Sequence, residues 1–223
     1  MSTRLKTWYP DVTYAGGRVG ADEVDYYHVY RVFCPSIDGT AIATASAIAT
    51  TATVAANVTT LDYPRNLVVT CAGGTSSGTY GGTVTVYGKN QFGEKILETF
   101  SIGTAVKGGT AVGTKVFGEF TSATARLSGD TAIATCNIGL GTAGTTTLFG
   151  LPFKVGGTGD LLNYSWASTG AAQFVPASSL GSYVSTTEHA ILARTDVVGT
   201  SSFVVWCKST YNQTKDDAPV VGR

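Results

Sequence analysis

The chain has 223 residues and a mass of 23.0 kDa, a length that fits one main domain. Charged residues make up only 13% of it, about half their share in ordinary soluble domains, and its 15 basic and 15 acidic residues cancel. A nucleic-acid partner is therefore not expected. The sequence also lacks an apolar signal-type start and the roughly 20 apolar residues of a membrane helix, so we expect synthesis in the cytoplasm and no membrane partner.

The first segment of the chain differs from the rest. Residues 1–25 mix proline, glycine, charges and aromatics without a period, which predicts an extended N-terminal arm that orders by lying on another surface. Trp8, Tyr9 and Tyr14 are poor residues for a solvated tail, so we take them as candidate docking residues. The alternative is a strap folded onto the protein's own domain.

Residues 26–210 are predicted to form one β-domain. Helical periodicity is almost absent, whereas short alternating runs bounded by glycine recur along the chain. Runs of this kind predict an all-β fold, an antiparallel β-sandwich or a jelly-roll-like barrel. The expected strands are 27–34, 66–72, 83–89, 94–101, 114–120, 131–138, 189–195 and 202–208.

Three further segments stand out. Residues 39–60 are nearly uncharged and rich in Ala and Thr, which favours a tightly packed strand or an extended crossing, covered by the fold or by another subunit. The hydrophobic turn within 141–160 either plugs the end of a barrel or inserts into a neighbour, and residues 211–223 read as a polar tail. The candidate interaction residues of the turn are Leu148, Phe149 and Leu151.

The stretch "GTVTVYGKNQFGEKILETF" (82–100) predicts a hairpin with a carboxylate, Glu98, among apolar residues. If the loop has three residues, with Gly93 in the left-handed position of a bulge, Glu98 lies opposite Val86 on the apolar face. A four-residue loop would place it opposite Thr85 instead. We favour the first register, in which Gly93 and Glu98 are structural. Glu98 then needs partners, either backbone amides or a base: Arg65 or Arg126.

Motifs for catalysis, cofactors or metals are absent from the sequence. There is no GxSxG, HExxH or GK[ST] pattern, and His28 and His189 lie in strand-like runs without metal-ligand spacing. A glycosidase pair of Glu94 and Glu98 lacks a cleft, because residues four apart on a strand project side by side. We therefore expect a protein that is not an enzyme, with no catalytic residue, cofactor or metal site.

The cysteines are expected to be buried hydrophobes, since free cysteine is among the most buried residue types. A disulfide formed in an oxidising medium is the alternative. The four positions are Cys34, Cys71, Cys136 and Cys207.

Several segments together resemble virion structural proteins of tailed bacteriophages, in particular those that decorate or cement the capsid. They are "YPRNLVVTCAG" (63–73), "GGTVTVYGKNQFGEKILETFSI" (81–102), "GTKVFGEFTSA" (113–123), "IGLGT" (138–142), "LFGLPFKV" (148–155) and "ARTDVVGT" (193–200). The resemblance covers about residues 61–200 and excludes the arm and the Ala/Thr segment. It implies a protein of the capsid surface that binds across junctions of the major capsid protein lattice, as a dimer or trimer.

Two other functions remain open from the sequence. The first is a neck, tail or fibre-associated component of the virion. The second is a carbohydrate- or surface-binding β-module, in which three aromatic residues would form the platform for a sugar. Those residues are Tyr164, Trp166 and Trp206, which core packing would equally explain.

Overall fold

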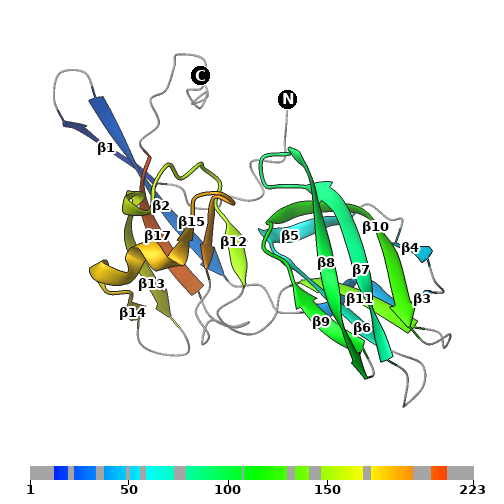
Figure 1. Cartoon of the computed structure of the whole chain (residues 1–223). Helices are drawn as coiled ribbons and strands as arrows, with labels where there is room; N and C mark the ends of the chain where they lie inside the picture. The colour runs from blue at the N-terminus through cyan, green and yellow to red at the C-terminus, as the bar shows by residue number, and fades with distance from the viewer. Residues whose placement is uncertain are drawn as a thin grey trace.

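The computed structural model describes residues 13–19, 23–33, 38–48, 51–55, 59–72, 79–106, 108–129, 134–140, 147–167, 172–192 and 202–209. These residues form three sheets with antiparallel pairing between their strands, together with two short 3₁₀ helices (Figure 1). The predicted all-β fold with an antiparallel sandwich is confirmed.

The largest sheet has eight strands. In order across the sheet its strands are β15 (Val184–Ser185), β16 (Ala190–Leu192), β12 (Leu148–Gly150), β5 (Thr59–Arg65), β10 (Phe117–Gly129), β7 (Thr79–Lys89) and β8 (Lys95–Val106), while β4 (Thr51–Ala55) also pairs with β10. Because β12 pairs with β5, this sheet links two hydrophobic cores.

The sandwich lobe consists of the larger part of this sheet and a second sheet of four strands. The second sheet contains, in order, β3 (Asp38–Ile48), β11 (Ala134–Leu140), β6 (Leu67–Ala72) and β9 (Gly108–Val112). Alternate side chains of both sheets meet in the sandwich core, as the period of two in a strand requires. Its largest members include Leu67, Val84, Phe117, Phe120 and Ile138.

The second lobe has its own core and a sheet of five strands. The sheet order is β1 (Thr13–Val19), β2 (Glu23–Phe33), β17 (Ser202–Ser209), β13 (Leu161–Ala167) and β14 (Ala172–Phe174), and the helices are η1 (Thr158–Asp160) and η2 (Ala177–Tyr183). Tyr30, Phe149, Leu151, Tyr164 and Val205 are among the residues of this second core. In Figure 1 this lobe lies to the left of the sandwich lobe, with β12 between them.

The predicted domain 26–210 contains two hydrophobic cores. The range 26–210 was predicted as one sandwich, but its buried residues divide between two cores, since β2 and the strands after residue 147 pack together. Within the predicted arm of residues 1–25, residues 13–19 form β1 and pair with β2. Residues 1–12 and the predicted tail 211–223 lie outside the described residues.

The Ala/Thr segment 39–60 contributes two strands and the start of a third. β3 pairs with β11 and β4 with β10, and Ile42 packs against the sandwich core. Of the two alternatives for this segment, the strand is the one the structure contains.

The hairpin of β7 and β8 has the three-residue loop. Asn90 N–H donates to the Glu94 carbonyl at 2.9 Å, and Gly93 has a φ of +84°, in the left-handed region that glycine adopts without strain. Val86 therefore pairs with Glu98. The register fixes which side chains of the hairpin reach the core and which face outward.

Candidate functional site at the junction of the lobes

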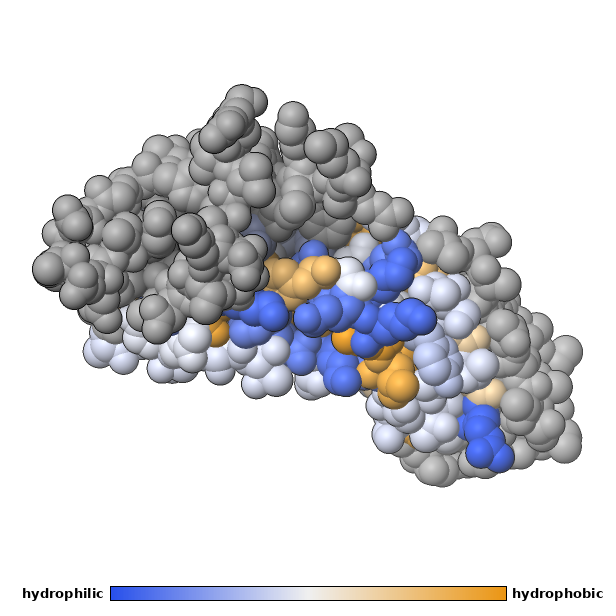
Figure 2. Space-filling model, turned by 90° about the horizontal axis from the view of Figure 1, so that it is seen from above, coloured by the Kyte–Doolittle hydropathy of each residue, from blue (hydrophilic) through white to orange (hydrophobic). Residues whose placement is uncertain are grey.

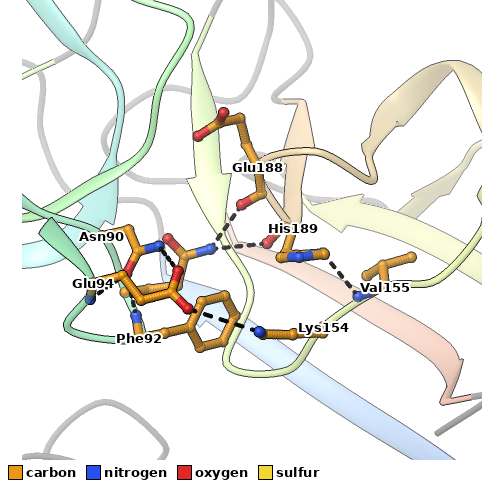
Figure 3. Close-up of polar contacts among 8 residues, drawn as sticks. Asn90, Phe92, Glu94, Lys154, Val155, Glu188 and His189 are labelled. Carbon is orange, nitrogen blue, oxygen red and sulfur yellow. Dashed lines mark hydrogen bonds and ion pairs between the residues drawn. The ribbon is translucent and has the colours of Figure 1, made fainter. Parts of the chain in front are cut away.

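The tip of the β7–β8 hairpin meets the second lobe at a turn that contains Glu188 and His189 (Figure 3). Gln91, in the hairpin loop, donates through Nε2 to the Glu188 carbonyl at 2.7 Å. The His189 carbonyl accepts a second bond, from the amide of Leu151 at 2.8 Å. The hairpin loop, the turn and the chain after β12 are therefore joined by hydrogen bonds to backbone groups.

The hairpin loop is itself braced by Asn90. Its Oδ1 accepts hydrogen bonds from the amides of Phe92 and Glu94, both at 3.0 Å. This braced loop presents the Phe92 ring edge-on to the His189 ring, with centroids 5.7 Å apart. Lys154 Nζ lies 5.5 Å from the centre of the Phe92 ring and 3.8 Å from Glu94 Oε1. Aromatic and cation–π contacts of this kind each contribute about 0.5–1.5 kcal/mol.

His189 has an unusual backbone and a defined tautomer. Its φ of +47° lies in the left-handed region, which histidine visits less readily than glycine. Its Nδ1 accepts a hydrogen bond from the Val155 amide at 3.2 Å, so the neutral ring carries its proton on Nε2. Desolvation lowers the pKa of His189, which keeps the ring neutral and the acceptor available.

Glu188 ties the same turn to the sandwich lobe. Its Oε2 accepts a hydrogen bond from the Val116 amide at 3.0 Å, just before β10 begins. Its own amide donates to Ser185 Oγ at 3.2 Å. The turn is thus bonded on one side to the sandwich lobe and on the other to the second lobe.

Asn66 makes a second tie between the lobes. Its Nδ2 donates to the Gly113 carbonyl at 2.7 Å, and its Oδ1 accepts from the Leu148 amide at 2.9 Å. The backbone of Asn66 also donates to the Leu148 carbonyl at 3.3 Å. The side chain is buried, where an unpaired amide is unfavourable, so these bonds fix three chain segments relative to one another.

Two tyrosines complete the junction. The hydroxyls of Tyr30 and Tyr63 share a hydrogen bond, and Tyr63 donates onward to the Gly150 carbonyl at 3.0 Å. Burial raises the pKa of Tyr30 to about 12. Because Tyr63 gives its one hydroxyl proton to Gly150, the bond between the two hydroxyls is donated by Tyr30. The chain of bonds connects β2 with β5 and β12.

The chemistry of the junction is that of a scaffold. Most of its carboxylate, amide, imidazole and hydroxyl groups bind backbone groups or one another, as buried polar groups require, although Gln91 Oε1 is buried without a hydrogen-bond partner in the described part of the chain. Among the described residues, no group of three or more His, Cys, Asp or Glu side chains lies close enough to hold a metal ion. In the same part of the chain, no helix has the length and apolar character needed to cross a membrane.

Glu98, one of the predicted structural residues, binds backbone amides rather than arginine. Its Oε1 accepts from the Thr114 amide at 2.6 Å and from Thr114 Oγ1 at 3.0 Å, and both of its oxygens lie 3.3 Å from the Lys115 amide. Gly113 lies so close that a β-carbon there would be 2.6 Å from Glu98 Oε2. The carboxylate thereby fixes the turn that leads from β9 into β10.

The predicted interaction residues fall in three different places. Phe149 and Leu151 are buried in the second core, so the prediction that they contact a partner is wrong: they fill their own domain, the plug alternative. Leu148 is half-buried at the junction. Tyr14 lies on β1 and pairs with His28. Trp8 and Tyr9 lie outside the described residues.

The aromatic residues considered for a sugar platform do not share a surface. Tyr164 is buried and donates through its hydroxyl to the Leu192 carbonyl at 3.2 Å. Trp206 is exposed on β17, while for Trp166 the structure describes only its place on β13. The core alternative therefore holds for Tyr164.

The residues that form the junction were not identified from the sequence. Gln91, Asn66 and Glu188 belong to no motif, and each acts on backbone groups 47 or more positions away. A polar residue directly before the apolar run "LVVTC", at position 66, was the one local signal of a buried amide.

Comparisons with known proteins found one weak structural similarity and no match in sequence. No family model matches the sequence, and no curated protein matches it. Among solved structures, the chain is similar to one described as the structure of the infectious bursal disease virus Gx strain, at 11% identity and a TM-score of 0.23. The match covers 87% of this chain and 41% of that chain, so the protein spans less than half the length of the viral chain. A likeness at this level carries no conclusion about function.

Proposed function

We propose that the chain is a structural virion protein that decorates and stabilises a bacteriophage capsid by binding across junctions of the major capsid protein lattice. In this proposal it lies on the capsid surface, associates as a dimer or trimer and catalyses no reaction. The support comes from the sequence segments that resemble capsid-decorating proteins and from one feature of the surface.

That feature is an exposed apolar pair on the outward face of the β7–β8 hairpin. Tyr87 and Leu97 are direct cross-strand partners, and they are 39% and 51% exposed. Beside them, Thr85 and Thr99 hydrogen-bond through their hydroxyls at 3.1 Å. We call these four residues the outer strip. β8 is the last strand of its sheet, and the exposed side chains of the strip can be reached by a neighbouring protein.

The outer strip has the character of a protein contact. An aromatic and an aliphatic side chain next to an uncharged polar pair are typical of the centre of an interface, and the next cross-strand pair on the same face, Lys89 and Lys95, would lie at its charged rim. In the view of Figure 2, hydrophobic residues form only small patches among neutral and hydrophilic ones. A contact of this size is small alone, so binding across a lattice junction would require several copies or further contacts.

The test combines particle composition with a surface variant. Purified particles of the phage that encodes the chain should contain it in a fixed proportion to the major capsid protein. Leu97→Thr should reduce that proportion without lowering the melting temperature, since threonine suits a strand. Leu162→Thr is the matched control, because Leu162 is 43% exposed on β13 in the other lobe.

Each contrary outcome has a distinct meaning. A copy number that matches a single ring would reject decoration and favour the neck or tail alternative. If the Leu97→Thr variant were incorporated into particles in unchanged proportion, the outer strip would not be the surface that binds the capsid. Loss of incorporation by Leu162→Thr alone would move the contact to the second lobe.

A further inference from the structure

Two cysteines face each other within the sandwich core. Cys71 on β6 and Cys136 on β11 are direct partners in the antiparallel pairing of these strands. Their sulfur atoms lie 3.3 Å apart, and the residues are 3% and 0% exposed. Both strands are inner strands of the four-stranded sheet, flanked by β9 and β3.

The backbone at this pair already has the spacing of a disulfide. Directly opposed residues of antiparallel strands have Cα atoms about 4.5 or 5.5 Å apart, depending on their hydrogen bonding. Both values lie inside the range of about 4.4–6.8 Å found for disulfides. Because both side chains point into the same core, only a small approach of the sulfur atoms is needed.

We propose that Cys71 and Cys136 are a modification site, a dithiol that a small oxidant such as a peroxide converts into a cross-strand disulfide. The inference goes beyond the proposed function and does not depend on it. If the protein leaves a reducing cytosol, the disulfide would form after its release from the cell and would stabilise the folded protein.

The reaction is balanced with hydrogen peroxide as the oxidant. A cysteine thiolate attacks one peroxide oxygen, which gives a sulfenic acid and releases hydroxide; hydroxide takes up the proton that the thiol lost and leaves as water. The second thiol then attacks the sulfenic sulfur, forming the S–S bond and releasing a second water. In total two thiols lose two electrons and two protons, and one peroxide is reduced to two waters.

The two thiols affect each other's ionisation. The hydrogen bond between them lowers the pKa of Cys71, whereas that bond and burial raise the pKa of Cys136. Either sulfur can be oxidised first, and the other then supplies the second sulfur. Burial also slows the first step, because the oxidant must enter the core.

The bond would join strands that are far apart along the chain. The two cysteines are 65 positions apart, and β7, β8, β9 and β10 all lie between them. Closing such a loop restricts the unfolded chain and thereby raises the free energy of unfolding. The stabilisation typical of disulfides corresponds to a rise in melting temperature of roughly 5–15 °C for a chain of this size.

Peptide mapping under non-reducing conditions tests the proposal. Trypsin cleaves after Lys and Arg and places the two cysteines in separate peptides, 66–89 and 127–154, neither of which holds another cysteine. After treatment of the folded, full-length protein with hydrogen peroxide, these peptides should appear linked, lighter by two hydrogens, and separate again on reduction. Cys71→Ser should abolish the linked species, whereas Cys207→Ser should retain it.

A second experiment tests whether a negative result arises only because the oxidant does not reach the buried thiols of the folded protein. The reduced, unfolded protein is refolded in a glutathione redox buffer, in which the strands pair while the thiols are still reachable. Free 66–89 and 127–154 peptides in both arms, or sulfinic acid at Cys71 without a link, would overturn the proposal. If the disulfide-bonded protein had the same melting temperature as the reduced protein, the claim that the bond stabilises the sandwich lobe would be overturned.

Discussion

Replacement of Glu98 by glutamine should destabilise the protein by removing a charge from its amide contacts. In the structure, Glu98 accepts hydrogen bonds from Thr114 and Lys115 through both carboxylate oxygens. Glutamine keeps one acceptor oxygen, which can serve Thr114. Its NH₂ group would then point toward the Lys115 amide, where donor faces donor.

The magnitude follows from the kind of bond that is lost. Hydrogen bonds to a charged group contribute about 1.5–3 kcal/mol, and those between neutral groups about 0.5–1.5 kcal/mol. Glu98 is only partly buried, so we take the lower end of each range. Glu98→Gln should then lower the free energy of unfolding by about 1 kcal/mol, which corresponds to about 2–4 °C in melting temperature for a chain of this length. Glu98→Ala should cost about twice as much, because both oxygens are lost.

Thermal and urea unfolding of the full-length protein measure the effect. Glu94→Gln is the matched control on the same hairpin, because Glu94 is exposed and its contact with Lys154 is long, at 3.8 Å. Exposed ion pairs contribute about 0–1 kcal/mol, so this variant should change the melting temperature less. If Glu98→Gln and Glu94→Gln had the same small effect, Glu98 would not hold the turn, and the reasoning from its amide contacts would be refuted.

Three further changes test the junction and the sheet. Asn66→Ala should lower the free energy of unfolding by about 2–3 kcal/mol in urea melts, since it leaves buried backbone groups without partners. Gly88→Ala should reduce the yield of folded protein or its melting temperature more than any other change proposed, because a β-carbon there would lie 2.1 Å from the backbone carbonyl oxygen of Glu119. His189→Asn should weaken the dependence of stability on pH below 6.5, the ordinary pKa of histidine, in unfolding curves across that pH range.

The hairpin was predictable from the sequence because its determinants are local. A glycine three residues after Asn90, between two alternating runs, was enough to favour the three-residue loop and to place Glu98 opposite Val86. The hydrogen-bond partners of Glu98 could not be predicted from the sequence, since the choice between amides and arginine depends on where the turn at Thr114 lies in space.

The second lobe was predicted only in part: the expected strands 27–34, 189–195 and 202–208 correspond to β2, β16 and β17, whereas β13 breaks the alternating pattern. In β13 the pairing with β17 shifts between Leu161 and Asn163, and this bulge interrupts the period of two. β5, which joins the large sheet to β12, was also missed, because it contains Asp62 and Pro64, residues that are depleted in strands. A single sandwich was therefore the simplest prediction from the runs that could be seen.

The junction could not be predicted from any window of sequence. Gln91 and Glu188 are 97 positions apart, and Asn66 and Leu148 are 82 apart. Contacts at such separations arise from topology, here from β12 joining the large sheet beside β5. Polar residues that bind backbone groups also carry no spacing of their own, unlike metal ligands or a catalytic motif.

The junction should weaken on acidification, and the sign follows from His189. Its pKa in the folded protein is lowered from 6.5, chiefly by desolvation; Lys154 also lowers it, while the carboxylates of Glu188 and Glu94 raise it. Below pH 6.5 the unfolded chain therefore takes up a proton more readily than the folded one, so the stability from the neutral ring is complete above pH 6.5 and is lost as the pH falls through the lowered pKa.

A charged ring would place a proton on Nδ1, where it faces the Val155 amide, and the contact between His189 and the second lobe would break. The variant His189→Asn keeps an acceptor and tolerates a positive φ, but it does not titrate. Its unfolding free energy should therefore fall less than that of the parent protein over the same pH range, while His28 remains in both. Equal pH slopes for the two proteins would show that His189 does not couple protonation to the junction.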